Sequence, residues 1–221
     1  MTQMAVCLDF DGTLVDSEPL HYAAWAEELS VFGAALDEEE YLRRFAGMGT
    51  LSTAAVLARE FKLAVLPAEL AARKGDRLMT LLATSLPRKE AGADELLAGL
   101  AELGASLALV TGAYRHEVLP VLKAFGWQEY FKAVITRDDV TQAKPHPEPY
   151  QRAVRALGRE PYQCYAVEDS ETGMLSALRA GLMTLVVTRP GVTLPPRPEP
   201  YHSFMRLSSL MTWFLARQQA D

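Results

Sequence analysis

Residues 4–18 read MAVCLDFDGTLVDSE, an apolar run that stops abruptly at two carboxylates. The run MAVCL (4–8) is hydrophobic throughout, which is typical of a strand buried on both faces of a parallel sheet. Asp9 and Asp11 follow at its end, two residues apart. Two acidic groups at the mouth of a buried strand cost free energy, because each disfavours the ionisation of the other. The stretch therefore predicts a functional site at the end of the first strand.

Four further apolar runs have the same character, and helical patterns separate most of them. The runs are SLALVT (106–111), KAVIT (132–136), QCYAVE (163–168) and MTLVVT (183–188). Amphipathic patterns cover 93–103, 114–126, 147–157 and 171–180, and each ends in or is followed by a glycine of the kind that ends helices. This alternation predicts an α/β protein, a Rossmann-like parallel sheet with helices on both faces.

Residues 17–85 interrupt this alternation, because they hold helical patterns and no strand-like run. About four helices are expected there. We predict that 17–85 form a small α-helical cap domain, inserted into an α/β core made of residues 1–16 and 86–221. The Pro-rich stretch 189–200 predicts a surface loop, and 211–216 a short final helix.

The composition is that of an ordinary globular protein of 221 residues, 49% hydrophobic and 23% charged. The net charge is −6 and no basic tract occurs, which argues against a nucleic-acid partner. No apolar run approaches the ~20 residues that a membrane helix needs. Nothing in the sequence indicates an oligomeric state.

Two cysteines, Cys7 and Cys164, both fall in predicted strands. If these strands are parallel neighbours, the stagger between the two thiols is roughly 10 Å, too far for a disulfide. We therefore expect reduced, buried thiols. Together with the lack of a secretory signal pattern, this predicts a cytoplasmic protein.

Polar residues also follow the other predicted strands. Thr111 and Gly112 end the second strand, Lys144 lies in the loop after the third, and Glu168 and Asp169 end the fourth. Ligands of an open parallel sheet bind beyond the carboxyl ends of its strands, so these side chains should converge with Asp9. Carboxylates brought together in this way repel one another without a cation, and their oxygens suit Mg²⁺. With a hydroxyl and an ammonium added, the set predicts a phosphoryl-transfer site.

Four segments resemble, in the same order, the four motifs of the haloacid dehalogenase-like hydrolase superfamily. They are DFDGTLVDSE (9–18), VTG (110–112), the lysine of AKPHPEPY (143–150) and VEDSETG (167–173). The helical insert resembles the family's small α-helical cap. The resemblance covers nearly the whole chain and looks closest to the branch of sugar-phosphate phosphatases and β-phosphoglucomutase.

The resemblance implies a two-step phosphoryl transfer. Asp9 would attack phosphorus and form an aspartyl-phosphate, while Asp11 would act first as general acid and then as general base. The implied Mg²⁺ ligands are Asp9, the backbone carbonyl of Asp11, Glu168 and Asp169. The implied phosphate-binding residues are Thr111, Gly112 and Lys144.

The resemblance also implies that the cap selects the substrate, a small phosphorylated metabolite such as a sugar phosphate. His21 lies one helical turn past Ser17, where the cap would meet the core. Gly47 and Lys74 resemble family specificity positions. We expect these three residues, His21, Gly47 and Lys74, to contact the substrate.

Other activities of the same superfamily remain open. A phosphosugar mutase would carry a cap arginine where Thr50 stands, and a Lys-Asn pair where Tyr114-Arg115 stands. A phosphonate hydrolase would need a cap lysine such as Lys62 or Lys74, although nothing in the sequence marks either as buried. A dehalogenase is disfavoured because Asp11 would have no proton to transfer.

Two alternatives of another class were compared with the same residues. An EF-hand calcium loop starting at Asp9 fails, because Leu14 stands where the pattern needs glycine and Leu20 where it needs glutamate. A phospho-accepting receiver module also places acids, a Thr and a Lys at strand ends. Such modules usually carry adjacent acids on the first strand, however, and have no place for a helical insert of this size.

Overall fold

The computed structural model describes residues 4–188 and 201–218. The chain divides into two compact units, a core unit of Met1–Val15 and Lys89–Asp221 and a helical unit of Asp16–Arg88. The sequence places the insert at 17–85, so the two borders differ by one and three residues from those expected.

The core unit contains a six-stranded sheet in which all neighbouring strands are parallel. Its spatial order is β5-β4-β1-β6-β7-β8. The strands are β1 (Ala5–Leu8), β4 (Ser106–Val110), β5 (Phe131–Ile135), β6 (Cys164–Glu168), β7 (Met183–Val187) and β8 (Tyr201–Phe204). The predicted α/β class and parallel sheet are confirmed, and five strands match their predicted runs. The sixth, β8, was not predicted, because its four residues YHSF are partly polar and half-exposed.

Strand β1 lies between β4 and β6, so Ala5 is opposite both Ser106 and Cys164. Cys7 is then two residues further along the sheet than Cys164, and both are buried, free thiols. The prediction that they do not form a disulfide is confirmed.

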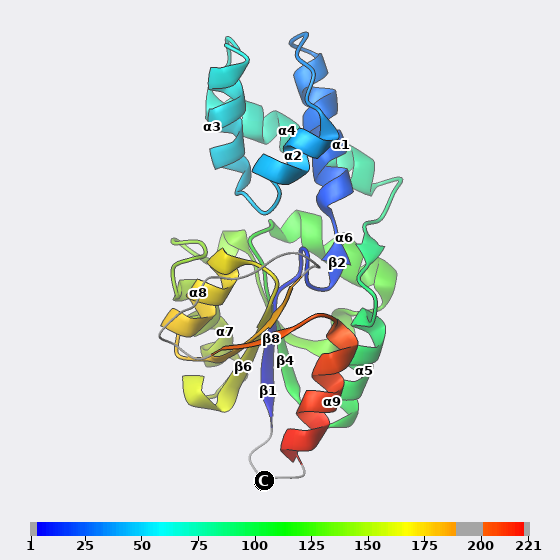
Figure 1. Cartoon of the computed structure of the whole chain (residues 1–221), viewed down its shortest axis with the longest axis vertical. Coiled ribbons are helices and arrows are strands. Elements are labelled where there is room, and N and C mark those ends of the chain that lie inside the picture. The colour runs from blue at the N-terminus through cyan, green and yellow to red at the C-terminus, as the bar shows by residue number, and fades with distance from the viewer. Residues whose placement is uncertain (1–3, 189–200, 219–221) are drawn as a thin grey trace. The chain divides into compact units, whose positions relative to one another are not determined.

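Helices cover both faces of this sheet (Figure 1). They are α5 (Ala93–Glu102), α6 (Arg115–Phe125), α7 (Glu148–Leu157), α8 (Glu171–Arg179) and α9 (Leu207–Gln218), with short 3₁₀ turns at Gln128–Tyr130, Arg137–Asp139 and Pro161–Gln163. Helices α7 and α8 pack on the face that carries small side chains such as Ala5, Cys7 and Ala108. Helix α9 packs on the opposite face, where the ring of Phe214 contacts that of Tyr165. The predicted final helix begins four residues earlier than expected, and the predicted loop 189–200 lies outside the described residues.

The helical unit consists of α1 (Glu18–Ser30), α2 (Glu38–Arg44), α3 (Thr50–Glu60) and α4 (Pro67–Leu82), so the expectation of about four helices is confirmed. Two short strands, β2 (Val15–Asp16) and β3 (Arg88–Lys89), pair at the points where the chain passes between the units. The helices share an apolar core that includes Trp25 and Leu70. Buried Glu28 of α1 forms ion pairs with Arg73 and Arg77 of α4.

Within the described part of the chain, none of the helices combines the length and the apolar character needed to span a bilayer.

Candidate active site

The topology of the sheet directs three loops to one place. From β1 the chain order runs outward through β4 and β5 on one side, and through β6, β7 and β8 on the other. In sheets of this kind the ligand site lies beyond the carboxyl ends of the strands at the point where the order reverses, which here is β1. The residues that follow β1, β4 and β6 therefore meet at this edge.

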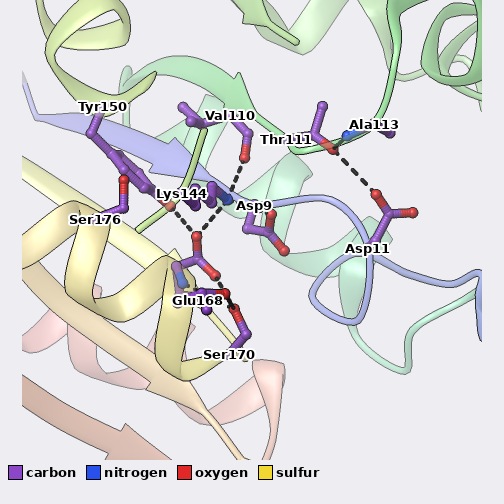
Figure 2. A network of polar contacts seen from close by, with 12 residues as sticks. Asp9, Asp11, Val110, Thr111, Ala113, Lys144, Tyr150, Glu168, Ser170 and Ser176 are labelled. Atoms are coloured by element: carbon purple, nitrogen blue, oxygen red, sulfur yellow. Dashed lines mark hydrogen bonds and ion pairs between the residues drawn. The ribbon is translucent and has the colours of Figure 1, made fainter. Parts of the chain in front are cut away.

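Lys144 connects two of the acidic side chains at this edge (Figure 2). Its Nζ donates to Asp9 Oδ1 at 2.7 Å, to Glu168 Oε1 at 2.6 Å and to the carbonyl oxygen of Val110 at 2.9 Å. Asp9 is 6% exposed and Glu168 is fully buried. An ammonium group has three donors, so all three hydrogens of Lys144 are used by protein acceptors.

Burial and charge act in opposite directions on these groups. Burial disfavours the charged ammonium of Lys144, but the carboxylates of Asp9 and Glu168 outweigh it and raise the pKa of the lysine. Burial raises the pKa of Glu168 to about 7, with a further contribution from the Asp9 carboxylate, against the lowering effects of Lys144 and Tyr150. The lysine therefore stays charged, while Glu168 titrates near neutral pH.

Three carboxylates at this edge have the geometry of a cation site. Asp9, Glu168 and Asp169 each offer an oxygen, and these oxygens lie within 4.8 Å of one another. Hard oxygen donors of this kind suit Mg²⁺, which is usually held by few carboxylates together with water and phosphate oxygens. The residues therefore fit the predicted metal. Asp11 does not contribute its carboxylate to this group, and its predicted contribution, the backbone carbonyl, stays a prediction.

Two glycines make room for these carboxylates. A Cβ atom on Gly12 would lie 2.1 Å from Asp169 Oδ2, and one on Gly173 would lie 1.9 Å from Glu168 Oε2. Gly12 also has a φ of +84°, which is strained for any residue with a side chain. Both positions allow the backbone to approach the acidic groups closely.

Asp11 and Thr111 form the second part of the site. The Thr111 hydroxyl donates to Asp11 Oδ2 at 3.2 Å and accepts from the Ala113 backbone N–H at 3.0 Å. Figure 2 shows this pair beside the Lys144 group. Gly112, the next residue, is exposed. The structure thus brings the predicted core residues to one edge of the sheet, while their roles remain predictions.

His21 and Lys74 lie together in the helical unit, with His21 Nδ1 2.6 Å from Lys74 Nζ. Lys74 is only 1% exposed, although nothing in the sequence analysis marked it as buried. Burial, and then the Lys74 charge, lower the pKa of His21 well below its ordinary value, so the imidazole is neutral. An ammonium can only donate, so Nδ1 of His21 accepts the hydrogen bond from Lys74. The hydrogen of the neutral His21 ring therefore lies on Nε2.

Gly47 is held by a residue that the sequence analysis did not single out. Glu18, in the first turn of α1, accepts from the Gly47 backbone N–H through Oε1 and from the Tyr41 hydroxyl through Oε2, each at 2.8 Å. The first turn of α1 therefore organises all three predicted substrate residues of the helical unit, since it carries His21, contacts Lys74 and holds Gly47.

Tyr150 is a second residue that the sequence analysis missed. It lies in α7 within the segment AKPHPEPY, and its hydroxyl is 2.5 Å from Glu168 Oε1. The signal was its place on the apolar face of the helix, with Ala153, Val154 and Leu157. A polar tip on such a face needs a buried partner.

Comparison with known proteins gives a consistent result. A family model described as "Hydrolase: haloacid dehalogenase-like hydrolase" matches residues 3–181. Validoxylamine A 7'-phosphate phosphatase of Streptomyces hygroscopicus subsp. limoneus is 34% identical over 187 residues, which cover 81% of this chain and 83% of that protein. Hexitol phosphatase B of Escherichia coli K12 is 28% identical over 195 residues, which cover 88% and 87%.

Solved structures show the same architecture. The crystal structure of CbbY from Rhodobacter sphaeroides in complex with phosphate superposes with a TM-score of 0.82 at 27% sequence identity, covering 95% of this chain and 96% of that one.

The first prediction concerns the close approach at Gly12. Gly12→Ala should weaken Mg²⁺ binding at least about tenfold, because the added methyl group displaces the Asp169 carboxylate. The measurement is a calorimetric titration of Mg²⁺ into metal-free protein. Gly126→Ala is the matched control, since Gly126 has a similar φ of +70° but nothing within 4 Å of an added Cβ. Equal Mg²⁺ affinities in the two variants would contradict the prediction.

The second prediction concerns pH. A carboxyl whose pKa rises from 4.5 to about 7 on folding stabilises the metal-free fold fully below about pH 4.5, and this contribution is lost as the pH rises through 7. A proton on Glu168 must leave before this carboxylate can hold a cation. The Mg²⁺ affinity should therefore fall by up to about tenfold per pH unit below pH 7 and level off above it. Calorimetric titrations at several pH values test this, and a constant affinity between about pH 5.5 and 8 would contradict it.

Proposed function

This chain belongs to the haloacid dehalogenase-like hydrolases, and we propose that it is a Mg²⁺-dependent phosphatase that hydrolyses a small phosphomonoester through an aspartyl-phosphate. The observation that carries the proposal is the group formed by Asp9, Lys144, Glu168 and Asp169 at the carboxyl end of β1. It combines a nucleophile, a buried ammonium and a set of oxygens suited to a divalent cation.

Asp9 is the proposed nucleophile. One of its carboxylate oxygens attacks phosphorus, the bond from phosphorus to the ester oxygen breaks, and the phosphoryl group is left on Asp9. The contact with Lys144 fixes the side chain through Oδ1. Water then attacks the same phosphorus and releases inorganic phosphate and free Asp9.

Asp11 is the proposed acid and base. It gives a proton to the departing alkoxide in the first step and takes one from the attacking water in the second. The hydroxyl of Thr111 holds its carboxylate in place. Only one residue, Phe10, separates Asp9 from Asp11 in the sequence, so both act from the same loop after β1.

The remaining core residues are proposed to hold the metal ion, to neutralise the acidic charge of the site and to bind the phosphoryl group. Mg²⁺, held by Asp9, Glu168, Asp169 and the backbone carbonyl of Asp11, would supply the positive charge that an acidic site needs before it can accept a phosphate dianion. Lys144 neutralises part of the acidic charge from inside the protein. Thr111 and Gly112, in the loop after β4, are proposed to bind the phosphoryl oxygens. Lys144 is proposed to bind one of them by exchanging one of its three protein acceptors for a phosphoryl oxygen.

The helical unit is proposed as the cap that selects the substrate. His21, Gly47 and Lys74 are its proposed substrate contacts, and the neutral His21 would offer an N–H donor through Nε2. Such a donor suits a hydroxyl or ester oxygen. Hexitol phosphatase B and validoxylamine A 7'-phosphate phosphatase are named for polyhydroxylated phosphate esters, which supports a sugar or polyol phosphate as the substrate here.

The free thiols Cys7 and Cys164 support a cytoplasmic location.

The mutase alternative receives less support from the structure. Nη2 of Arg115 donates to Asp139 at 2.6 Å and to the Val134 carbonyl at 3.2 Å, so this nitrogen of the guanidinium is held at the end of β5. Thr50, which stands where a mutase would carry a cap arginine, is the first residue of α3. Membership of a hydrolase family also argues against a receiver module.

The third prediction tests the nucleophile. Asp9→Asn should lower phosphate release at least about a thousandfold, because a carboxamide cannot take the phosphoryl group. The assay measures inorganic phosphate released from a panel of sugar and polyol phosphates in Mg²⁺, with wild type in excess EDTA as a second arm. Asp76→Asn, at an exposed position of α4, is the control and should retain activity. Full activity of Asp9→Asn, or of wild type in EDTA, would refute the proposed mechanism.

The fourth prediction separates hydrolysis from phosphoryl migration. With β-glucose 1-phosphate as the substrate, any turnover should give free glucose and inorganic phosphate, because Thr50 stands where a mutase would carry its cap arginine and Arg115 is paired with Asp139. Product analysis by ³¹P NMR distinguishes the outcomes. Accumulation of glucose 6-phosphate would establish the mutase instead.

A further inference from the structure

Tyr150 lies beside Lys144 and Glu168 and contacts both (Figure 2). Its hydroxyl is 2.5 Å from Glu168 Oε1, and its ring centroid is 5.3 Å from Lys144 Nζ. We propose that Tyr150 is a positioning residue, which fixes the Glu168 carboxylate in the orientation that binds the divalent cation. The inference deepens the proposed function, because it assigns a residue to the support of its metal site.

The direction of the hydrogen bond follows from the chemistry of the two groups. Tyr150 is fully buried. Its phenol O–H is a hydrogen-bond donor and the Glu168 carboxylate oxygen is an acceptor, so the hydroxyl donates the hydrogen bond to Glu168 Oε1. A short bond between a neutral donor and a carboxylate is among the stronger hydrogen bonds in proteins.

This donation divides the two oxygens of Glu168 between separate tasks. Oε1 accepts from both Tyr150 and Lys144, at 2.5 and 2.6 Å. Oε2 has only a long contact of 3.4 Å with the Ser170 hydroxyl among the described residues. Since a carboxylate oxygen has two lone pairs, Oε1 is saturated and Oε2 keeps the capacity to bind a cation. Without the Tyr150 hydroxyl, either oxygen could turn toward Lys144.

The ring of Tyr150 is itself held rigidly. It belongs to the apolar cluster between α7 and the sheet, with Ala5, Ala108 and Ala166 among its members. These small strand residues leave space for a large ring beneath the site. A phenylalanine would fill this space equally well, and a buried hydroxyl costs free energy unless it is bonded. The hydroxyl is therefore explained by its bond to Glu168 and not by packing.

The fifth prediction compares two tyrosine variants. Tyr150→Phe should weaken Mg²⁺ binding by about ten- to a hundredfold in a calorimetric titration of metal-free protein, since loss of such supporting partners has effects of this size. The variant should fold, because the ring is kept, and its kcat at saturating Mg²⁺ should change far less than the Mg²⁺ concentration needed for half activity. Tyr41→Phe is the matched control. Tyr41 is also buried and donates to a glutamate, Glu18, at 2.8 Å, but in the helical unit.

Wild-type Mg²⁺ affinity in Tyr150→Phe would overturn the inference. An equal loss of Mg²⁺ affinity in Tyr41→Phe would also overturn the inference, because the loss in Tyr150→Phe would then be explained by general destabilisation of the protein. The Mg²⁺ titration requires no substrate. If wild type released phosphate from none of the esters tested, the proposed function would fail while the role of Tyr150 could still be measured.

Discussion

The ion pairs of Lys144 with Asp9 and Glu168 are the interaction on which the rest of the core depends. Several carboxylates gather at one edge of a buried sheet, and this ammonium is the positive group that the protein itself places among them. Removing one partner from a buried pair leaves an uncompensated charge, which typically costs about 3–5 kcal/mol. The lysine also bonds the Val110 carbonyl, so it ties the end of β4 to those of β1 and β6. The fold and the site are stabilised by the same contacts.

A second constraint is space. The acidic groups can meet only because the surrounding backbone carries no side chains at two points, Gly12 and Gly173. Small residues on one face of the sheet bring α7 close enough for Tyr150 to reach Glu168. A proton, a metal ion and the Lys144 ammonium all compete for the buried carboxylate of Glu168. This competition makes the site sensitive to pH and to divalent cations.

Much of this arrangement could be predicted from residue patterns, and the reasons differ between elements. Continuous apolar runs identify strands buried on both faces, so β1, β4 and β6 and the polar residues that follow them were placed correctly. Strand β8 was missed because its pairing depends on β7 and not on its own four residues. The burial of Lys74 and the contact of Tyr150 with Glu168 were missed for a different reason: each is a polar residue on an apolar helix face. Lys74 stands between Leu70 and Leu78 at spacings of four, and this pattern would have shown that it is buried.

The central claim is that Asp9 carries the phosphoryl group during turnover. The most direct measurement is to quench Asp11→Asn protein in acid during reaction with an aryl phosphate, whose phenolate can leave without a proton from residue 11. The protein is then reduced with borohydride and its peptides are sequenced by mass spectrometry. Slow hydrolysis in this variant should let the intermediate accumulate, and reduction should convert residue 9 to homoserine. Modification of a different residue, or no covalent phosphate under conditions in which the ester is consumed, would contradict the account.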